Sequence, residues 1–578
     1  MRRFIGKIFK WIGAVTVLLI TLVIFVALNS GRDLPEKMVL EVDFRKGVVE
    51  HIPDHPLAEL LGSHRLSVRE KTMTLLGAAS DDRVLGVVGR VGNSRMSLAH
   101  VQELSEAIAA VRSAGKPTVA FAETIGGLIP ANGSYLLASA FGEINLQPSG
   151  AIGFVGLAVE HPFLKGTLDS LGIKASFGKR ENYKNAPNLF TEDSFTVDHL
   201  EATRSLLSDQ FDQIISGVAA GRKVAEAEVL RWVDSGPHSA QDAIELGIVD
   251  RLSYSDQVYS DLLTRLGEAE VIDLQDYADL IDEADGTRVA LIYSAGAIGT
   301  GSSRYDPISE ELTVGSDTVI DAFKAATKDP DIRAILFRID SPGGSYVASD
   351  AIWHATRMAQ VKGLPVVVSM GSAAASGGYL VSSHADRVIA QPGTITGSIG
   401  VWAGKFITRD FWSRLGVQWD EVYFGKHASL GTSLTDFSDG ERQRFNKELD
   451  RVYDAFVDQV AEGRGLSDEA SLASARGRIW TGKQAKERGL VDTLGGFPEA
   501  ISAIREILEL EVDAGVAFEI YPKPKELAER ILEGDWEGLS SLADTKLPVL
   551  PTLRSLDLLR GAASGPLAWA PWLGKVLH

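Results

Sequence analysis

The sequence repeats itself, and this repeat restricts the possible folds more than any other feature. The segments Tyr135–Pro148 (YLLASAFGEINLQP) and Tyr379–Pro392 (YLVSSHADRVIAQP) align without gaps, and the match continues into the glycines that follow. Upstream, Val84–Val91 (VLGVVGRV) aligns with Ile332–Ile339 (IRAILFRI). A chain that carries two copies of one long pattern is expected to fold as two units of the same architecture.

Each copy alternates short apolar strands with helical runs. The candidate first strands are Met38–Val42 and Val289–Tyr293, and typical helical runs are Val101–Ala114 and Tyr346–Gln360. Apolar strands that alternate with helices are typical of parallel sheets covered by helices. We therefore predict an α/β fold with two tandem repeats.

The repeats define the expected domains. The first is predicted to span residues 33–285 and the second residues 286–520, joined by an acidic and poorly periodic link around Gly267–Thr287. Residues 521–578 form a proline-broken tail, expected to be a loosely ordered terminus because untethered termini are usually mobile. A partner-binding segment and a membrane-surface contact are the alternatives for this tail.

Residues 1–31 have the pattern of a basic tip followed by a membrane anchor. Met1–Lys10 is rich in arginine and lysine, and Trp11–Leu28 (WIGAVTVLLITLVIFVAL) carries no charged residue. Its length is at the short end for a transmembrane helix. Basic residues before the apolar stretch predict a cytoplasmic N-terminus and an extracytoplasmic body. A cleaved signal peptide is the alternative, although Asn29–Arg32 is a poor cleavage site.

Composition excludes several classes of protein. The formal net charge is −19 and the body has no long basic block, which argues against a nucleic-acid partner. The chain has no cysteine, so disulfides, thiolate metal sites and a cysteine nucleophile are all excluded.

The second copy contains the residues for acyl-transfer chemistry. The strand Leu364–Met370 runs into a small-residue elbow in which Ser376 is followed by Gly377 and Gly378. A serine at the start of a helix, next to backbone N–H groups that no Cβ shields, can serve as a nucleophile. A second glycine-rich turn, Ser341–Gly344, ends the strand before it.

The first copy has lost both features. It has Asn93–Met96 in place of the Ser341–Gly344 turn, and Asn132 in place of Ser376. Only the second copy is therefore expected to hold an acyl intermediate.

The nucleophile needs a base, and the sequence offers two kinds. The second copy contains His354, His384 and His427, but none is placed like the base of an Asp–His relay. A lysine kept neutral by burial is the other solution. Lys179 and Lys184 of the first copy follow a predicted strand, and the aligned stretch of the second copy has Ala428 or Gly431 where Lys184 stands.

These motifs together resemble the long, double-repeat form of the signal peptide peptidase A family, membrane-anchored Ser–Lys peptidases related to Clp protease and the crotonase fold. The resemblance is carried by Asp340–Gly344, Ala374–Tyr379 and Thr396–Gly400 and extends over the anchor and both repeats. It implies two Clp/crotonase-like repeats, with Ser376 as nucleophile and Lys184 as general base. The family pattern is Gly-Lys-aromatic-Lys, whereas three residues separate Lys179 from Tyr183 here, so Lys179 stays an alternative base.

The resemblance also implies the rest of the site and its setting. Gly344 and Gly377 would supply the oxyanion N–H groups, and Ser398, which is Phe154 in the first copy, would orient the lysine. No metal or other cofactor is needed. The expected protein is a homotetrameric peptidase of the bacterial inner membrane, with its catalytic body on the periplasmic side, that degrades cleaved signal peptides and other extended or unfolded peptides. A crotonase-like acyl-CoA enzyme and a non-catalytic membrane scaffold are the alternatives.

Overall fold

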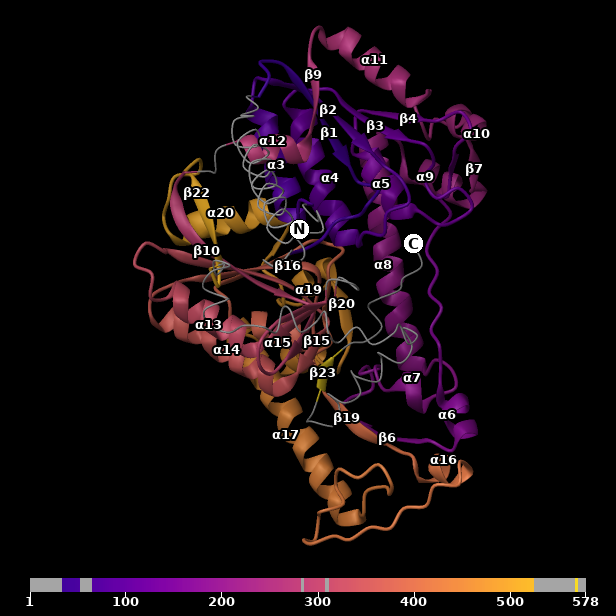
Figure 1. Ribbon diagram of the computed structural model, residues 1–578, viewed down its shortest axis with the longest axis vertical. Helices are drawn as coiled ribbons and strands as arrows, with labels where there is room; N and C mark the ends of the chain where they lie inside the picture. Colours follow the sequence, from indigo (N-terminus) through magenta and orange to yellow (C-terminus); the bar gives the residue numbers. More distant parts are fainter. Residues whose placement is uncertain (1–33, 52–64, 282–284, 307–310, 524–566, 570–578) are drawn as a thin grey trace, which may run out of the picture.

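The computed structural model describes residues 34–51, 65–281, 285–306, 311–523 and 567–569 (Figure 1). The predicted anchor lies outside these ranges. Among the residues that the structure describes, no helix combines the length and the apolar character that crossing a bilayer requires.

The first unit is built on a parallel sheet with the strand order β8-β4-β3-β2-β1-β9. Its strands are β1 (Met38–Asp43), β2 (Val84–Arg90), β3 (Thr118–Ala122), β4 (Glu143–Leu146), β8 (Arg251–Leu252) and β9 (Glu270–Asp273). The helices that cover one face of the sheet include α3 (Val68–Ser80), α4 (Leu98–Ser113), α5 (Asn132–Ser139) and α8 (Val197–Arg222). The helix α11 (Ser255–Leu266) covers the other face.

The second unit repeats this plan. Its main strand order is β20-β18-β16-β14-β10-β22, with β17 paired to β16 and β21 paired to β17. Only the β18–β20 pair is antiparallel among these described strands. The strands are β10 (Thr287–Ala295), β14 (Ala334–Ser341), β16 (Val366–Ala375), β17 (Arg387–Ala390), β18 (Ile395–Gly397), β20 (Ile479–Thr481), β21 (Thr493–Leu494) and β22 (Val516–Tyr521). The covering helices are α13 (Ser316–Ala326), α14 (Tyr346–Val361), α15 (Gly377–Ser382) and α17 (Asp439–Arg464) on one face and α20 (Phe497–Ile507) on the other. The predicted parallel sheets with covering helices are confirmed.

The two units also match in detail. Each contains one 26-residue helix, α8 in the first and α17 in the second. The last turn of α8 pairs Arg222 with Asp250, and the last turn of α17 pairs Arg464 with Asp492. In each case the aspartate also accepts a backbone N–H from a strand of its sheet. The same ion pair therefore ties the long helix to the sheet in both copies.

A third sheet joins the units, in the order β12-β13-β11-β15-β23-β19-β6. Its strands are β6 (Lys174–Lys179), β11 (Ala297–Gly299), β12 (Arg304–Asp306), β13 (Glu311–Gly315), β15 (Gly343–Ser345), β19 (Trp402–Ile407) and β23 (Leu567–Trp569). The β6 strand of the first unit pairs antiparallel with β19 of the second along its whole length. In Figure 1, β6, β19, β23 and β15 lie together below the second unit's main sheet, where α8 descends from the first unit.

Both the link and the tail contain described strands. Within the link around Gly267–Thr287, β9 extends the first sheet and α12 (Leu274–Leu280) packs beside it. In the tail, Leu567–Trp569 forms β23 between β15 and β19, and the rest of the tail beyond Lys523 lies outside the described residues. β9 and β23 are held by backbone hydrogen bonds to neighbouring strands. Such bonds depend little on side-chain identity, so the sequence pattern does not reveal them.

Candidate active site

Ser376 lies at the sharp turn between β16 and α15. Its backbone has φ 58° and ψ −115°, a conformation that residues other than glycine rarely adopt. Such a conformation costs on the order of 1–3 kcal/mol and must be held by its surroundings. Pairing of Ala373–Ala375 with β18, and the bond from the Ser376 N–H to the Gly397 carbonyl (2.7 Å), hold it here. The side chain is thereby fixed at the end of the strand, as in the nucleophile elbows of serine hydrolases.

Lys184 reaches Ser376 from the first unit. The pairing of β6 with β19 brings the chain after Lys179 alongside the loop at Arg476–Arg478. Gly477 makes the close approach possible, since a Cβ there would lie 2.5 Å from the backbone nitrogen of Lys184. Gly477 also has φ 75°, which an L side chain rarely adopts.

The two side chains meet inside the protein. Lys184 Nζ lies 2.7 Å from Ser376 Oγ, 2.9 Å from the carbonyl oxygen of Ser398 and 3.1 Å from Ser398 Oγ. Lys184 is 1% exposed and Ser376 is fully buried. Three oxygen partners thus fix the position of the amine next to the serine hydroxyl.

Burial also decides the protonation of this amine. It lowers the pKa of Lys184 to about 7, because a low-dielectric environment disfavours the ammonium form. Near neutral pH a large share of the molecules therefore carries a neutral amine, which can accept a proton from Ser376 Oγ.

Two glycine-bearing segments meet beside Ser376. Gly344, in β15, leaves no room for a side chain, since a Cβ there would collide with the carbonyl oxygen of Ile298. Gly378 follows the elbow, and a Cβ at this position would lie 2.8 Å from the Ser341 carbonyl oxygen. The turn that carries Gly344 and the elbow that carries Gly377 are therefore packed backbone against backbone.

The other candidate bases have different partners. Lys179 Nζ donates to Asn188 Oδ1 (3.0 Å) and to the Asn182 carbonyl (3.4 Å), and burial lowers its pKa as well. His384 packs edge-on against Trp353, with its Nε2 3.7 Å from a Glu462 oxygen. Of the basic residues considered from the sequence, the geometry joins Lys184 to Ser376.

The matching position in the first unit is closed by a side chain. Asn132 Nδ2 donates to the Gly156 carbonyl (2.7 Å), and its Oδ1 accepts the N–H groups of Gly156 (3.0 Å) and Val155 (3.2 Å). Phe154, at the position equivalent to Ser398, is buried against Tyr135. An amide and an aromatic ring thus stand at the two sequence positions that carry the hydroxyls of Ser376 and Ser398 in the second unit.

An extended strand already lies beside the candidate oxyanion turn. β23 pairs antiparallel with β15, with Ala568 opposite Gly344, and its Leu567 lies opposite Trp402 of β19. The gap between β15 and β19 is thus wide enough for one extended backbone, which hydrogen-bonds to a neighbouring strand as in β-strand addition.

Sequence reasoning missed two residues that support this site. Gly477 allows Lys184 to approach, but nothing in its local sequence marks the contact. Asp340 accepts the backbone N–H of Ala373 (2.9 Å), three residues before Ser376. A signal for Asp340 was available: it belongs to the Asp340–Gly344 motif, and the first copy has Gly92 in its place.

A serine hydroxyl in contact with a buried amine of lowered pKa, at a strand-to-helix turn of an α/β fold, is the arrangement of a serine acyl-transfer enzyme. The sequence matches peptidase family S49 over residues 110–267 and 358–511, one match in each repeat. The chain belongs to peptidase family S49 and is a serine protease that hydrolyses peptide bonds.

Relatives along most of the chain agree with this assignment. Protease 4 of Salmonella typhi is 30% identical over 75% of this chain and 71% of its own length. Protease 4 of Haemophilus influenzae is 28% identical over 80% of this chain and 76% of its own. The chloroplastic serine protease SPPA of Arabidopsis thaliana is 28% identical over 81% of this chain and 70% of its own.

The buried amine leads to a prediction about stability. Between pH 7 and about 10.4 the unfolded chain binds a proton at Lys184 that the folded chain lacks, so wild-type stability rises with pH there. Lys184→Met removes this linkage and should raise the urea midpoint at pH 7 and below, with a gain that shrinks toward pH 10. Lys179→Met, at a less buried site, should give a smaller gain. A Lys184→Met variant no more stable than wild type at pH 6–7 would mean that the amine stays solvated.

Proposed function

We propose that this protein is a membrane-anchored serine endopeptidase that uses Ser376 and Lys184 as a catalytic dyad to degrade signal-peptide remnants and other extended peptides. The observation that carries the proposal is the 2.7 Å contact between Lys184 Nζ and Ser376 Oγ, made by an amine whose pKa burial lowers to about 7. In this proposal each repeat is Clp/crotonase-like.

The reaction begins at the dyad. Neutral Lys184 takes the proton of Ser376 Oγ as the oxygen attacks the carbonyl carbon of the peptide. Ser398, which contacts the amine through both its carbonyl and its hydroxyl, keeps Nζ directed at Ser376. When the C–N bond breaks, the lysine ammonium returns the proton to the leaving amine, and an acyl-Ser376 ester remains. Lys184 then deprotonates a water that attacks this ester, and it returns the proton to Ser376 Oγ as the acyl C–O bond breaks and the acid leaves.

The negative charge on the carbonyl oxygen needs donors. The N–H groups of Gly344 and Gly377 are the candidates, because both belong to segments packed backbone to backbone around Ser376. Removing one such donor typically costs about 3–4 kcal/mol of transition-state stabilisation.

An extended substrate fits the space beside β15. The pairing of β23 with β15 and β19 supports a binding mode in which the substrate adds one strand to the third sheet. Folded proteins cannot offer a free strand there, so extended or unfolded peptides are favoured over the acyl-CoA alternative, which needs no such strand.

The proposals of a membrane anchor and of a homotetramer are supported by the sequence. The uncharged stretch Trp11–Leu28 supports a membrane anchor with the body on the periplasmic side, and the family resemblance supports a homotetramer. Ser376 and Lys184 meet within one chain, so the assembly would serve to enclose the sites rather than to complete them.

The dyad is tested with a fluorogenic, apolar, extended peptide and full-length protein. Ser376→Ala and Lys184→Ala should each lower kcat by roughly a thousandfold or more, because the two groups act as one unit. Lys179→Ala is the matched control and should keep near wild-type activity, since its amine contacts Asn188. Loss of activity in Lys179→Ala alone would make Lys179 the base, and full activity in Ser376→Ala would end the proposal.

The strand position gives a second prediction. If β23 lies where the substrate binds, weakening it should lower KM and leave kcat unchanged. Ala568→Pro removes a backbone N–H within β23 and should have this effect. Ala563→Pro, in the same tail but outside β23, should behave as wild type. An unchanged KM in Ala568→Pro, and in a chain that ends at Lys523, would show that the substrate binds elsewhere.

A further inference from the structure

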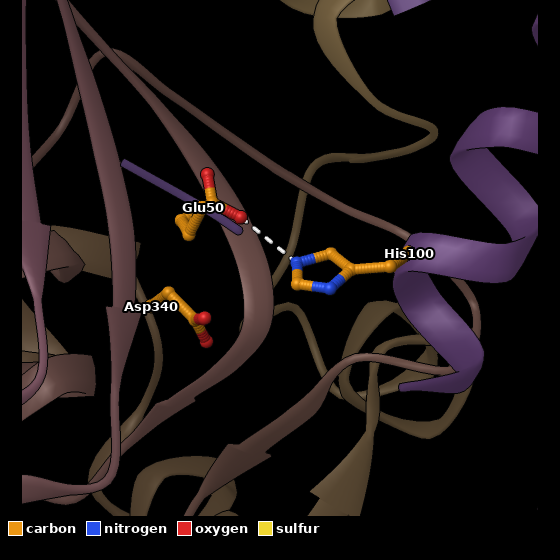
Figure 2. Close-up of side chains that lie close together, drawn as sticks. All are labelled: Glu50, His100 and Asp340. Carbon is orange, nitrogen blue, oxygen red and sulfur yellow. Dashed lines mark hydrogen bonds and ion pairs between the residues drawn. The ribbon is translucent and has the colours of Figure 1, made fainter. Parts of the chain in front are cut away.

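A buried polar cluster lies where the first unit meets the strands that carry the active site. Figure 2 shows three of its members: Glu50 and His100 from the first unit and Asp340 from the end of β14. His100, on α4, makes a 2.8 Å contact from Nε2 to Glu50 Oε2, and both side chains are at most 8% exposed. The dyad chemistry described above does not use any of these groups.

Arg338 is the permanent cation of this cluster. It is fully buried and donates to both oxygens of Glu50 (2.6 and 3.2 Å) and to Glu103 (2.9 Å). Glu50, Glu103 and Asp340 are three carboxyl groups around one guanidinium. A buried carboxylate is expensive unless a cation pairs with it. A proton on His100 supplies the second positive charge.

Asp340 connects this cluster to the nucleophile strand. Ile339 pairs with Met370 and Ser341 with Ala374, so the residues 371–373 of β16 bulge opposite Asp340 alone. A bulge leaves backbone groups without partners in the ladder. Asp340 Oδ1 accepts the N–H of Ala373 (2.9 Å), and its Oδ2 lies 3.4 Å from Ser372 Oγ.

The same bulge touches the first unit. Ser372 Oγ lies 3.2 Å from His100 Nε2, and Glu50 Oε2 would be 3.0 Å from a Cβ at Gly371. Asp340 is also the residue directly before the turn that carries Gly344. One carboxylate therefore contacts the strand that leads to Ser376 and begins the turn of the candidate oxyanion donor.

We propose that His100 is a positioning residue for the peptidase reaction: through Glu50, Ser372 and Asp340 it fixes the β16 bulge that sets Ser376 relative to Gly344. The inference rests on the proposed Ser376 chemistry. It assigns the first unit a second task besides supplying Lys184, which is to hold the nucleophile strand of the second unit in register.

The charge of His100 gives this role a pH signature. The groups that face it are Glu50, Asp340, Arg338 and Ser372, with Glu103 behind Arg338. Burial alone would lower the pKa of His100, but the bond and charge of Glu50 raise it overall. The cation, and the stability it adds, are thus present at low pH and lost as pH rises through this raised pKa.

The two titrations act in opposite directions. Loss of the proton from Lys184, near pH 7, raises activity, whereas loss of the proton from His100, whose pKa Glu50 raises, lowers it. Asp340, whose pKa burial raises, accepts the Ala373 N–H more strongly as a carboxylate, so its ionisation adds to the rising side. A descending limb in the profile of kcat against pH would therefore report the loss of the proton from His100.

The experiment measures kcat and KM of full-length protein from pH 6 to 10 with the apolar fluorogenic peptide. Active sites are counted by fluorophosphonate labelling of Ser376, so that misfolded molecules do not enter kcat. His100→Ala should lower kcat by about tenfold to a hundredfold, the usual effect of a misplaced reacting group, with KM unchanged. His100→Gln keeps a donor for Glu50 without the charge, and should retain more activity but lose the descending limb. The control is His238→Gln, a buried histidine bonded to the Trp232 carbonyl away from the bulge.

A double-mutant cycle measures the coupling between His100 and Asp340 in kcat, which a merely structural role of His100 would not change. If His100 acts through Asp340, the effects of His100→Gln and Asp340→Asn on kcat should be non-additive, whereas independent effects would add. Additive effects, or a His100→Ala variant with wild-type kcat per labelled site and an unchanged descending limb, would overturn the inference. Turnover that does not depend on Ser376 would instead overturn the proposed function itself.

Discussion

Lys184 carries its amine into a fully enclosed position, 2.7 Å from Ser376 Oγ, and the other oxygens around it belong to Ser398. Removal from water lowers the pKa of this lysine to about 7. The rest of the site follows from this burial. Gly477 has to lack a side chain to admit the lysine backbone, and Ser376 has to hold a strained conformation to present its hydroxyl. The fold supplies the rigid surroundings that such a conformation requires.

Both repeats of the chain contribute residues around Ser376. Each copy keeps the same sheet, the same long helix and the same ion pair at that helix's end. In the first copy, Asn132 stands at the position of Ser376, and its side chain is bonded to the backbone of Gly156. The pairing of β6 with β19 places Lys184 of the first unit next to Ser376 of the second. Contacts from His100 and Glu50 of the first unit reach the bulge in β16 that precedes Ser376. Both connections join the first unit to the backbone of the nucleophile strand or its neighbours.

Strands and turns could be predicted from the sequence where neighbouring residues determine them. Apolar strands such as Met38–Val42 and the elbow around Ser376 follow from patterns within a few residues. Pairing across the units could not be read, because β6 and β19 meet through backbone hydrogen bonds that place few demands on side chains. The same applies to β23 in the proline-broken tail. Lys184 was found by resemblance to a family motif, whereas its contact with Ser376, and that of Lys179 with Asn188, could not be read because the two lysines lie on one short segment.

If a lysine kept neutral by burial activates Ser376, the rate at which a fluorophosphonate labels Ser376 between pH 5 and 8 depends on the protonation of that lysine. This rate should rise about tenfold per pH unit, bend toward a plateau near pH 7, and lose this dependence in Lys184→Met. A labelling rate that ignores pH over this range, or one whose rise survives in Lys184→Met, would contradict activation of Ser376 by this lysine.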